Sequence, residues 1–408
     1  MKTVLLLLTL LICGGAAYSQ TQPSLSLLRD PEVVRTFSTL PVQESGRIKP
    51  LDTIARYRLL RFHGTRTLRF ENPETGKSDK LSAMEWMLIS WFRPDIAKDL
   101  PLFRVDSPDA ITEIGATAKG RMEGVRGKYT YNDILPHRNT LMEKAEEYRQ
   151  MDPKKRTSVQ TMIANLGINY LDFEMILTHW DLFRTPFGQN EKGLPEELAK
   201  SIPKPYRIAT LIPAVFDYLK KHPEAAAPMS NPWMMDFLKG ALGGMMTGNR
   251  EMTLRIFPPT QSANEQWHGP GPIIMDNLQT KEVLPYDLEW MTQYENIILN
   301  AGDAEKFKSA VTAFAEKTKA GAAARNEAKY VDLEASYHRT DYFYYSLIYF
   351  TLGLILLATT WAAPGSKYEK AAIIGTWISV LVATAYCITG IVVRCIIMQR
   401  PPITTLYE

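Results

Sequence analysis

Two long uncharged apolar runs dominate the hydrophobic pattern of the chain. The first covers residues 342–362 and the second covers residues 371–393. Each run is about 20 residues long, which as an α-helix spans a bilayer core of roughly 30 Å. Because only a helix satisfies its own backbone hydrogen bonds in hydrocarbon, the pattern predicts two transmembrane helices that form a hairpin.

The long segment before these runs, residues 20–341, follows a different pattern. Apolar residues recur every three or four positions with charges between them, which is typical of amphipathic helices that share a core. We expect helices over 81–92, 139–151, 158–180, 288–299, 304–324 and 329–339. The sequence therefore predicts a mainly α fold, in which a helical domain is followed by a C-terminal two-helix transmembrane hairpin.

A stretch rich in proline and glycine, residues 186–285, interrupts the helical pattern. Proline and glycine disfavour regular helices and mark turns and loops. Short strands are expected at 206–212 and 254–257, where β-branched and aromatic residues gather between these breakers. We therefore expect a small irregular or β-containing insert within the helical domain.

The first 19 residues have the composition of a signal peptide. Lys2 is followed by an apolar run at 4–12 and by small residues at 14–17. An A-x-A-like cleavage site follows, so Gln20 is the expected mature N-terminus. The helical domain, residues 20–341, is then expected to be exported.

The loop between the two apolar runs carries Lys367 and Lys370. Short loops with lysine and arginine stay on the cytoplasmic side of a membrane, so residues 363–370 are expected inside and residues 394–408 on the outer face. We expect the protein in the cytoplasmic (inner) membrane, with its large domain on the periplasmic or outer side.

Composition narrows the function classes. The formal net charge of +3 at pH 7 is too small to indicate nucleic-acid binding. Of the three cysteines, Cys13 lies in the signal peptide, whereas Cys387 and Cys395 lie in or beside the second membrane helix. No disulfide is therefore expected in the exported domain. The absence of a C-x-x-C-H motif indicates that the chain is not itself a c-type cytochrome.

No catalytic constellation is evident in the sequence. The six histidines are scattered, without the spacing of a zinc site, and there is no H-E-x-x-H motif, nucleophile elbow or phosphate loop. His338 is the one histidine placed just above the first membrane helix. We expect neither catalytic residues nor a metal site in this chain.

One run near the start of the exported domain is distinctive: residues 40–56, LPVQESGRIKPLDTIAR. It predicts an extended segment, a turn at 45–46, and a helix that begins near Pro50 with Asp52 or Thr53 as its cap. In a simple structured loop, the two cations of this run would pair with local carboxylates.

Three segments, in this order, resemble System II cytochrome c biogenesis proteins. The run 40–56 resembles the start of their exported domain. EASYHR at 334–339 resembles their E-x-x-Y-N-R entry to a membrane helix, with His338 in place of asparagine. TGIVVRCIIMQRPPITTLYE at 389–408 resembles the opening of the cytochrome c assembly (CcsA/ResC-like) channel module, usually R-P-P-V-T-N-L-Y-E, with Thr405 in place of asparagine.

The resemblance covers nearly the whole mature chain. The residues that match the motifs at its two ends are Gly46, Arg47, Pro50, Leu51, Asp52, Arg400, Pro401, Pro402, Leu406, Tyr407 and Glu408. It implies a membrane-bound component of cytochrome c maturation, in which haem is carried outward and its vinyl groups are joined to apocytochrome thiols. The exported domain is then expected to dock apocytochrome c or partner subunits.

The same resemblance limits what can be said about haem. The family's W-W-D segment and its histidine ligands lie downstream of the R-P-P motif, and no such segment occurs in these 408 residues. Haem is therefore the implied cofactor, but its ligands are not in this chain. The remaining channel is expected from a separate polypeptide or a longer form of this one. The implied partners are apocytochrome c, the rest of the channel, partner membrane subunits and lipid, without nucleic acid.

Arg394 and Arg400 are the candidate cofactor-binding residues. Positive charge on the outer side of a membrane helix runs against the insertion bias, and a guanidinium fork matches a carboxylate such as a haem propionate. The alternative is that both side chains reach lipid phosphates. Arg394 borders the apolar run, so we expect its surroundings to be drier than those of Arg400.

Two other classes of function compete with this interpretation. One is a membrane-tethered periplasmic binding or sensor protein without a catalytic role, although no cytoplasmic domain is evident to receive a signal. The other is a membrane-anchored hydrolase, which needs a nucleophile or metal constellation. Haem absorbance in purified membranes would separate these classes.

Overall fold

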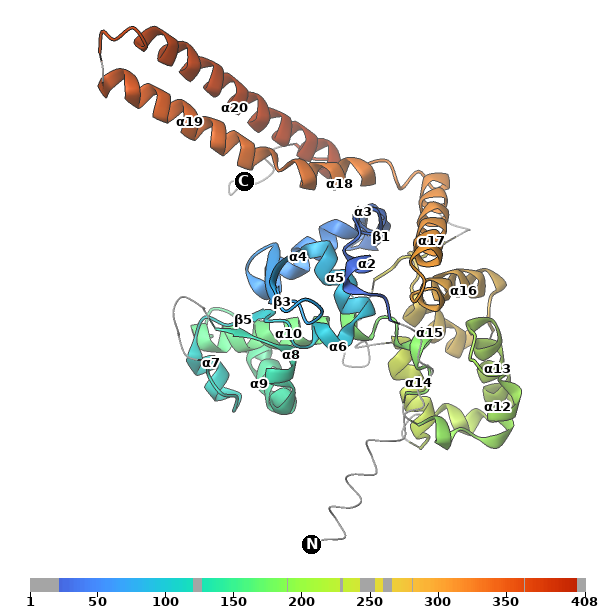
Figure 1. Ribbon diagram of the computed structural model, residues 1–408. Coiled ribbons are helices and arrows are strands. Elements are labelled where there is room, and N and C mark those ends of the chain that lie inside the picture. The colour runs from blue at the N-terminus through green and yellow to red at the C-terminus, as the bar shows by residue number, and fades with distance from the viewer. Residues whose placement is uncertain are drawn as a thin grey trace.

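A computed structural model describes residues 22–119, 127–188, 190–227, 230–242, 254–259, 266–280, 282–362 and 364–401. The expected signal peptide, residues 1–19, lies outside the described residues, as do Pro402, Leu406, Tyr407 and Glu408. The described part is mainly helical and contains short strand pairs, which confirms the expected fold class. In Figure 1 a helical hairpin extends away from a compact body.

The first half of the body places helices around short β-hairpins. Its helices are α2 (Leu25–Leu28), α3 (Pro31–Ser38), α4 (Leu51–His63), α5 (Ala83–Phe92), α6 (Pro94–Ala97), α7 (Pro108–Glu113), α8 (Tyr131–Ile134), α9 (Arg138–Gln150) and α10 (Ser158–Thr178). Its antiparallel strand pairs are β1 (Pro41–Glu44) with β2 (Arg47–Pro50), β3 (Thr67–Glu71) with β4 (Ser78–Ser82), and β5 (Phe103–Arg104) with β6 (Lys128–Tyr129).

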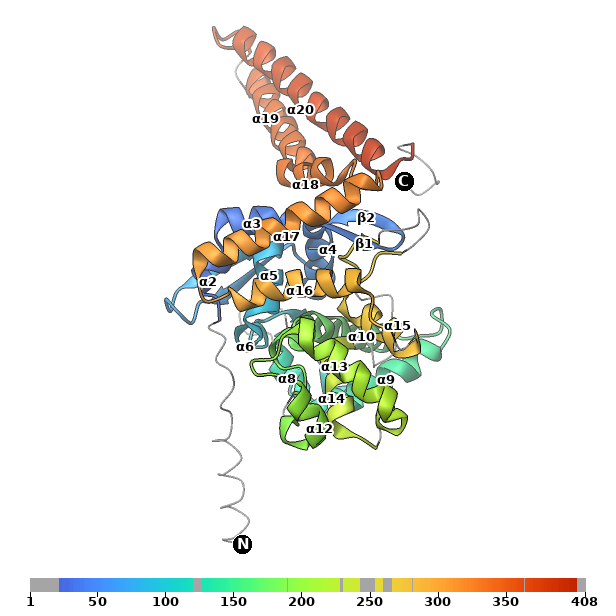
Figure 2. The same cartoon turned by 90° about the vertical axis from the view of Figure 1, so that its right-hand side faces the viewer.

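The second half of the body is helical, and a membrane hairpin follows it. The helices of this half are α11 (Asp181–Arg184), α12 (Glu196–Ser201), α13 (Ile208–Lys221), α14 (Pro232–Leu242), α15 (Pro270–Thr280), α16 (Pro285–Leu299) and α17 (Ala304–Ala324). Then come α18 (Val331–Thr340), α19 (Tyr342–Ala362) and α20 (Glu369–Met398). Figure 2 shows α18 between the body and the hairpin, with α17 running along α3.

Most predicted helices are confirmed with small shifts at their ends. The helix predicted at 304–324 has the expected bounds, and α19 matches the first membrane run. The helix predicted at 81–92 begins two residues later, because Leu81 and Ser82 belong to β4. Ser82 also closes a capping box with Glu85, which sets the start of α5.

Two local predictions are wrong. The strand expected at 206–212 is not formed, because α13 begins at Ile208; its buried residues recur at helical spacing, with Leu211 and Val215 among them. The cap expected for α4 is also wrong. Pro50 precedes that helix without a side-chain cap, and Asp52 and Thr53 lie in the first turn.

The strand expected at 254–257 is reduced to isolated bridges. Arg255 pairs with Gln43 and Phe257 pairs with His268. The described parts of the 186–285 region are otherwise largely helical, and the paired strands that the structure describes lie earlier in the chain.

The core of the body is aromatic. Trp180 stacks on Tyr294 with ring centroids 3.8 Å apart, and Phe92 lies 5.2 Å from the same tryptophan. These rings come from α5, α16 and the residue before α11, so one cluster joins the two halves of the body. Aromatic pairs of this kind add to the hydrophobic stabilisation of a core.

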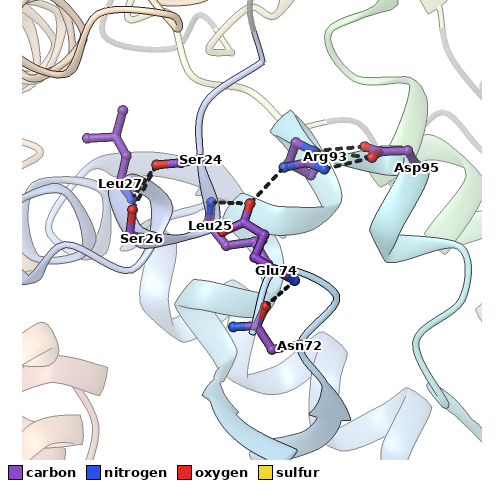
Figure 3. Close-up of polar contacts among 8 residues, drawn as sticks. All are labelled: Ser24, Leu25, Ser26, Leu27, Asn72, Glu74, Arg93 and Asp95. Carbon is purple, nitrogen blue, oxygen red and sulfur yellow. Dashed lines mark hydrogen bonds and ion pairs between the residues drawn. The ribbon is translucent and has the colours of Figure 1, made fainter. Parts of the chain in front are cut away.

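Polar contacts hold the start of the described chain to the body (Figure 3). Glu74 accepts hydrogen bonds from the Leu25 backbone at 3.2 Å and from Arg93 Nη1 at 3.3 Å. Arg93 also pairs with Asp95, and the Asn72 side chain accepts from the Glu74 backbone. The β3–β4 loop therefore fastens α2 beside α5 and α6.

The hairpin has two helices long and apolar enough to cross a membrane. Small residues lie between them: Ser346 donates to the Ala383 carbonyl at 2.9 Å, and Ser379 donates to the Tyr349 carbonyl at 2.8 Å. Large side chains such as Leu354 point outward. This arrangement is typical of helices packed in lipid. The second helix begins and ends outside the predicted 371–393 run.

Candidate functional site

The membrane-proximal side of the body carries a buried charge cluster. Arg47 Nη1 donates to Glu334 Oε2 at 2.6 Å, and its Nη2 donates to Oε1 at 3.0 Å. Thr53 Oγ1 donates to Glu334 Oε1 at 2.9 Å. We call Arg47, Thr53 and Glu334 the junction cluster. It joins positions 287 residues apart in the chain.

The turn between β1 and β2 and the start of α4 bring the side chains of Arg47 and Thr53 close together. Ser45 and Gly46 have φ values of 52° and 76°, and a two-residue hairpin turn of this kind requires positive φ at both positions. Arg47 is therefore the first residue of β2. Pro50 ends that strand and α4 begins at once, which places Thr53 near Arg47.

The buried carboxylate of Glu334 requires hydrogen-bond donors from the protein. The Glu334 side chain is only 5% exposed, whereas that of Arg47 is 31% exposed. A buried carboxylate needs paired donors, and the parallel donors of a guanidinium fork satisfy both of its oxygens. Removing Arg47 would leave a buried charge with Thr53 as its remaining side-chain donor.

A second polar group lies beside the cluster. Arg56 Nε donates to Asp52 Oδ2 at 2.6 Å, and Asp52 is buried. His338 follows Glu334 by four residues on α18, so the two share a helix face. The half-buried His338 ring feels the charges of both Asp52 and Arg56.

The hairpin reaches the same side of the body. Helix α18 packs on β2, α4 and α20. Gln399 follows the last residue of α20 in a left-handed conformation, and its side chain contacts that of Tyr330, the residue before α18. Arg400 and Pro401 follow directly. The first two segments that carry the resemblance and the described part of the third, residues 389–401, therefore approach one another around α18.

The candidate arginines are placed differently from expectation. Helix α20 continues to Met398, so Arg394 lies within the helix rather than after it. Both Arg394 and Arg400 are exposed on the protein, and protein packing alone does not make one drier than the other. Among the described residues, no ion pair of Arg394 is formed.

The motif residues divide into structural and polar roles. Gly46 supplies the turn, Pro50 ends the strand and Leu51 is fully buried. Arg47 enters the junction cluster, and Asp52 pairs beside it. In the alternative of a simple structured loop, both cations of the run would pair with local carboxylates. Lys49 does bond to Glu44, whereas the partner of Arg47 is distant in the chain.

The most buried histidines serve the core of the body. Burial lowers the pKa of His179 to about 3, and its Nε2 lies 2.7 Å from the Tyr294 hydroxyl. Burial and the nearby Lys128 lower the pKa of His63 to about 4. In the described part of the chain, no three His, Cys, Asp or Glu side chains converge on a metal-sized site. We assign none of these residues as a haem ligand.

Comparison with known proteins gives no family assignment. No family model matches the chain, and no curated protein matches it. The resemblance to cytochrome c biogenesis proteins therefore depends on the three quoted segments.

Proposed function

We propose that this chain is a membrane-bound component of cytochrome c maturation, active in haem delivery and attachment on the outer face of the cytoplasmic membrane. One observation supports the proposal most directly. Arg47 of the first family-like segment forms a bidentate ion pair with Glu334 of the second, and the third begins beside the same helix. Segments that specify one function in distant parts of a chain are expected to meet in space.

In this proposal the body docks apocytochrome c or partner subunits, and the hairpin belongs to the channel. The junction cluster fixes the body to α18, which leads directly into α19. A docked protein is thereby held at a defined orientation above the membrane. The thioether chemistry needs the haem-handling W-W-D segment, which is not among these 408 residues.

The test is a reporter cytochrome c matured by the complete system, with its covalent haem measured per unit of reporter. Arg47→Gln should lower the yield most, because it leaves the buried Glu334 carboxylate without its guanidinium and weakens the junction by about 3 kcal/mol. Glu334→Gln should lower the yield less, because the Arg47 side chain is 31% exposed and can be solvated. The reversed pair Arg47→Glu with Glu334→Arg should recover part of it. Lys200→Gln, which removes an exposed ion pair with Glu196, should leave the yield unchanged.

Membrane abundance and urea unfolding of each variant separate loss of function from loss of fold. If the junction variants are abundant, folded and fully active in maturation, the proposed role of the junction is wrong. The same assay on Arg394 and Arg400 tests propionate binding. Replacement by Lys should already reduce covalent haem if the guanidinium fork matters, whereas normal yield with both Lys and Gln leaves only membrane anchoring.

The proposed orientation has its own test. Ser366 lies in the loop between α19 and α20, and we expect that loop in the cytoplasm. In a variant without the native cysteines, Ser366→Cys should react with an impermeant maleimide only after the membranes are opened. Labelling in intact cells would show that the loop lies outside and that the orientation is opposite to the proposed one.

A further inference from the structure

Helix α4 carries an exposed stripe next to the junction cluster. Arg56, Tyr57, Leu60 and Arg61 share one helix face, because residues three and four positions apart are neighbours on a helix. Tyr57 is 59% exposed and Leu60 is 40% exposed, although the opposite face of α4 lies in the core. The Arg61 guanidinium lies 5.7 Å from the centroid of the Tyr57 ring. We call these residues the α4 stripe. Exposed apolar and cationic groups on one face are typical of helices that rest on a lipid surface.

The α4 stripe begins where the body meets the membrane hairpin. Thr53 lies at the N-terminal end of the same helix face, and its hydroxyl donates to Glu334 of α18 at 2.9 Å. From Glu334 to Tyr342, the first residue of α19, the chain makes about two helical turns, or roughly 12 Å along a helix. The stripe is therefore close to the level at which the hairpin enters the membrane.

The arrangement of the helices places the stripe on the membrane side of the body. The His338 ring, just before α19, feels the charges of Arg56 and of Arg66, which follows α4 in the loop to β3. In Figure 1 the hairpin leaves α18 toward the side of the body on which α4 lies, whereas α16 lies on the opposite side. A bilayer around the hairpin therefore passes close to α4.

Two cations near the C-terminal end of α4 lack an acidic partner. Arg66 is exposed and forms no ion pair with the acidic residues that the structure describes. Lys128 Nζ lies 3.1 Å from Nε2 of the neutral His63. Burial and the charge of the nearby Arg104 lower the pKa of Lys128. The surface beside the α4 stripe therefore carries unbalanced positive charge, which attracts anionic lipid headgroups.

We propose that the α4 stripe docks on the membrane that the hairpin crosses, with Tyr57 and Leu60 at the boundary between headgroups and acyl chains and Arg66 against anionic headgroups. Tyrosine suits this level because its ring is apolar and its hydroxyl is polar. The hairpin already holds the body at the bilayer, so the effective lipid concentration is high and a small contact area suffices. The inference needs the membrane hairpin and not the proposed function.

The test uses the full chain in nanodiscs of phosphatidylcholine and phosphatidylglycerol, with the native cysteines replaced by serine. Leu60→Cys carries an NBD fluorophore, and nitroxide-labelled phosphatidylcholine in the bilayer is the quencher. The control is the same fluorophore at Leu284→Cys, an equally accessible position (Leu284 is 55% exposed) just before α16. Quenching at position 60 should be roughly twofold stronger than at position 284, because only the first lies against the lipid.

Lipid composition and a second variant separate the contributions. In nanodiscs of phosphatidylcholine alone, quenching at position 60 should fall toward that at position 284, since the anionic headgroups are missing. Tyr57→Ser combined with Arg66→Gln should have the same effect in the anionic nanodiscs. Lys200→Gln, which removes an exposed cation on α12, should not. An unchanged urea midpoint of each variant shows that the body stays folded.

Two outcomes would overturn the proposal. Equal quenching at positions 60 and 284 in anionic nanodiscs would show that the α4 stripe does not touch lipid and is open to a protein partner instead. Quenching at position 60 that is as strong in phosphatidylcholine alone, and is unaffected by Tyr57→Ser with Arg66→Gln, would show that neither the ring nor the cation holds the body on the membrane.

Discussion

The body and the membrane hairpin use the same residue type in opposite ways. All six tryptophans of the body are buried, and Trp180 is 0% exposed. The two tryptophans of the hairpin are exposed instead, Trp361 by 76% and Trp377 by 67%. In the body, burial of large apolar side chains drives folding. Between helices in lipid that driving force is lost, so small residues allow close packing while large ones face outward.

The junction cluster is held together by a third kind of contact, an ion pair. Neither a large aromatic contact nor small-residue packing dominates there; a buried carboxylate is paired with a guanidinium. Such a pair is directional, and it contributes little when its desolvation is counted. Its value is to select one orientation of α18 on the body. In this protein, the aromatic core supplies most of the stability of the body, whereas the ion pair between Arg47 and Glu334 sets the orientation of α18 on it.

The largest effect should come from opening the aromatic core. Trp180→Ala removes contacts to Phe92 and Tyr294 and should lower the free energy of unfolding of the body by about 3–5 kcal/mol. Trp377→Ala removes an exposed ring and should leave that free energy unchanged. Urea unfolding of both variants in nanodiscs, followed by far-UV circular dichroism, measures the difference. Equal losses would contradict the opposite use of tryptophan.

A smaller effect should come from widening the hairpin. A Cβ atom at Gly390 would lie 3.0 Å from Tyr342 Cβ, so Gly390→Leu should force the helices apart at about 1–3 kcal/mol. Ile391→Leu, at the neighbouring exposed position, is the matched control. The readout is disulfide formation between Ser346→Cys and Ala383→Cys, with the native cysteines replaced by serine.

Gly390→Leu should slow that cross-link while the urea midpoint of the body stays constant. If the body loses stability as well, the hairpin and the body fold as one unit and the comparison between them fails.

The smallest effect concerns pH. The pKa of Glu295 is raised to about 7, so its contribution to stability is present below its unfolded value near 4.5 and is lost as pH rises through 7. The pKa of His179 is lowered to about 3, so its contribution is present above pH 6.5 and is lost as pH falls. Between pH 4.5 and 6.5 these two dependences oppose each other.

Glu295→Gln should remove the pH dependence of stability that comes from Glu295 and leave the one that comes from His179. The free energy of unfolding of this variant, minus that of the wild type, should then rise with pH by up to about 1.4 kcal/mol per unit over this interval. Urea titrations at several pH values measure the slope. Parallel profiles would show that the carboxyl group has no raised pKa in the folded body.

Local signals in the sequence predicted much of the fold. The helix at 304–324 follows from its apolar period. Its cap residue, Asp303, accepts a hydrogen bond from the backbone of Lys306, three residues further along the chain. The turn at Ser45 and Gly46 follows from the preference for positive φ in two-residue hairpins. The membrane hairpin follows from length and hydropathy alone. Each of these features depends on residues a few positions apart.

Tertiary structure decided what these elements do. The sequence marked the run around Arg47, but it did not predict Glu334 as its partner, because the pairing requires α18 to lie across β2. The signal for Glu334 was present in the family-like segment 334–339, although without a geometric role. A pocket lined by Arg184, Leu211 and Glu295 was also not predictable, since these residues come from three different helices, α11, α13 and α16.

The same limit explains the insert. Prolines and glycines at 186–285 suggested an irregular structure, yet packing against α16 stabilises α13 as a helix despite Pro213 within it. The sequence by itself determined where most of the long helices form and which segments suit lipid, because the apolar period is local. Only the tertiary structure decided which charges meet and where space remains, because both depend on how distant surfaces are brought together by burial.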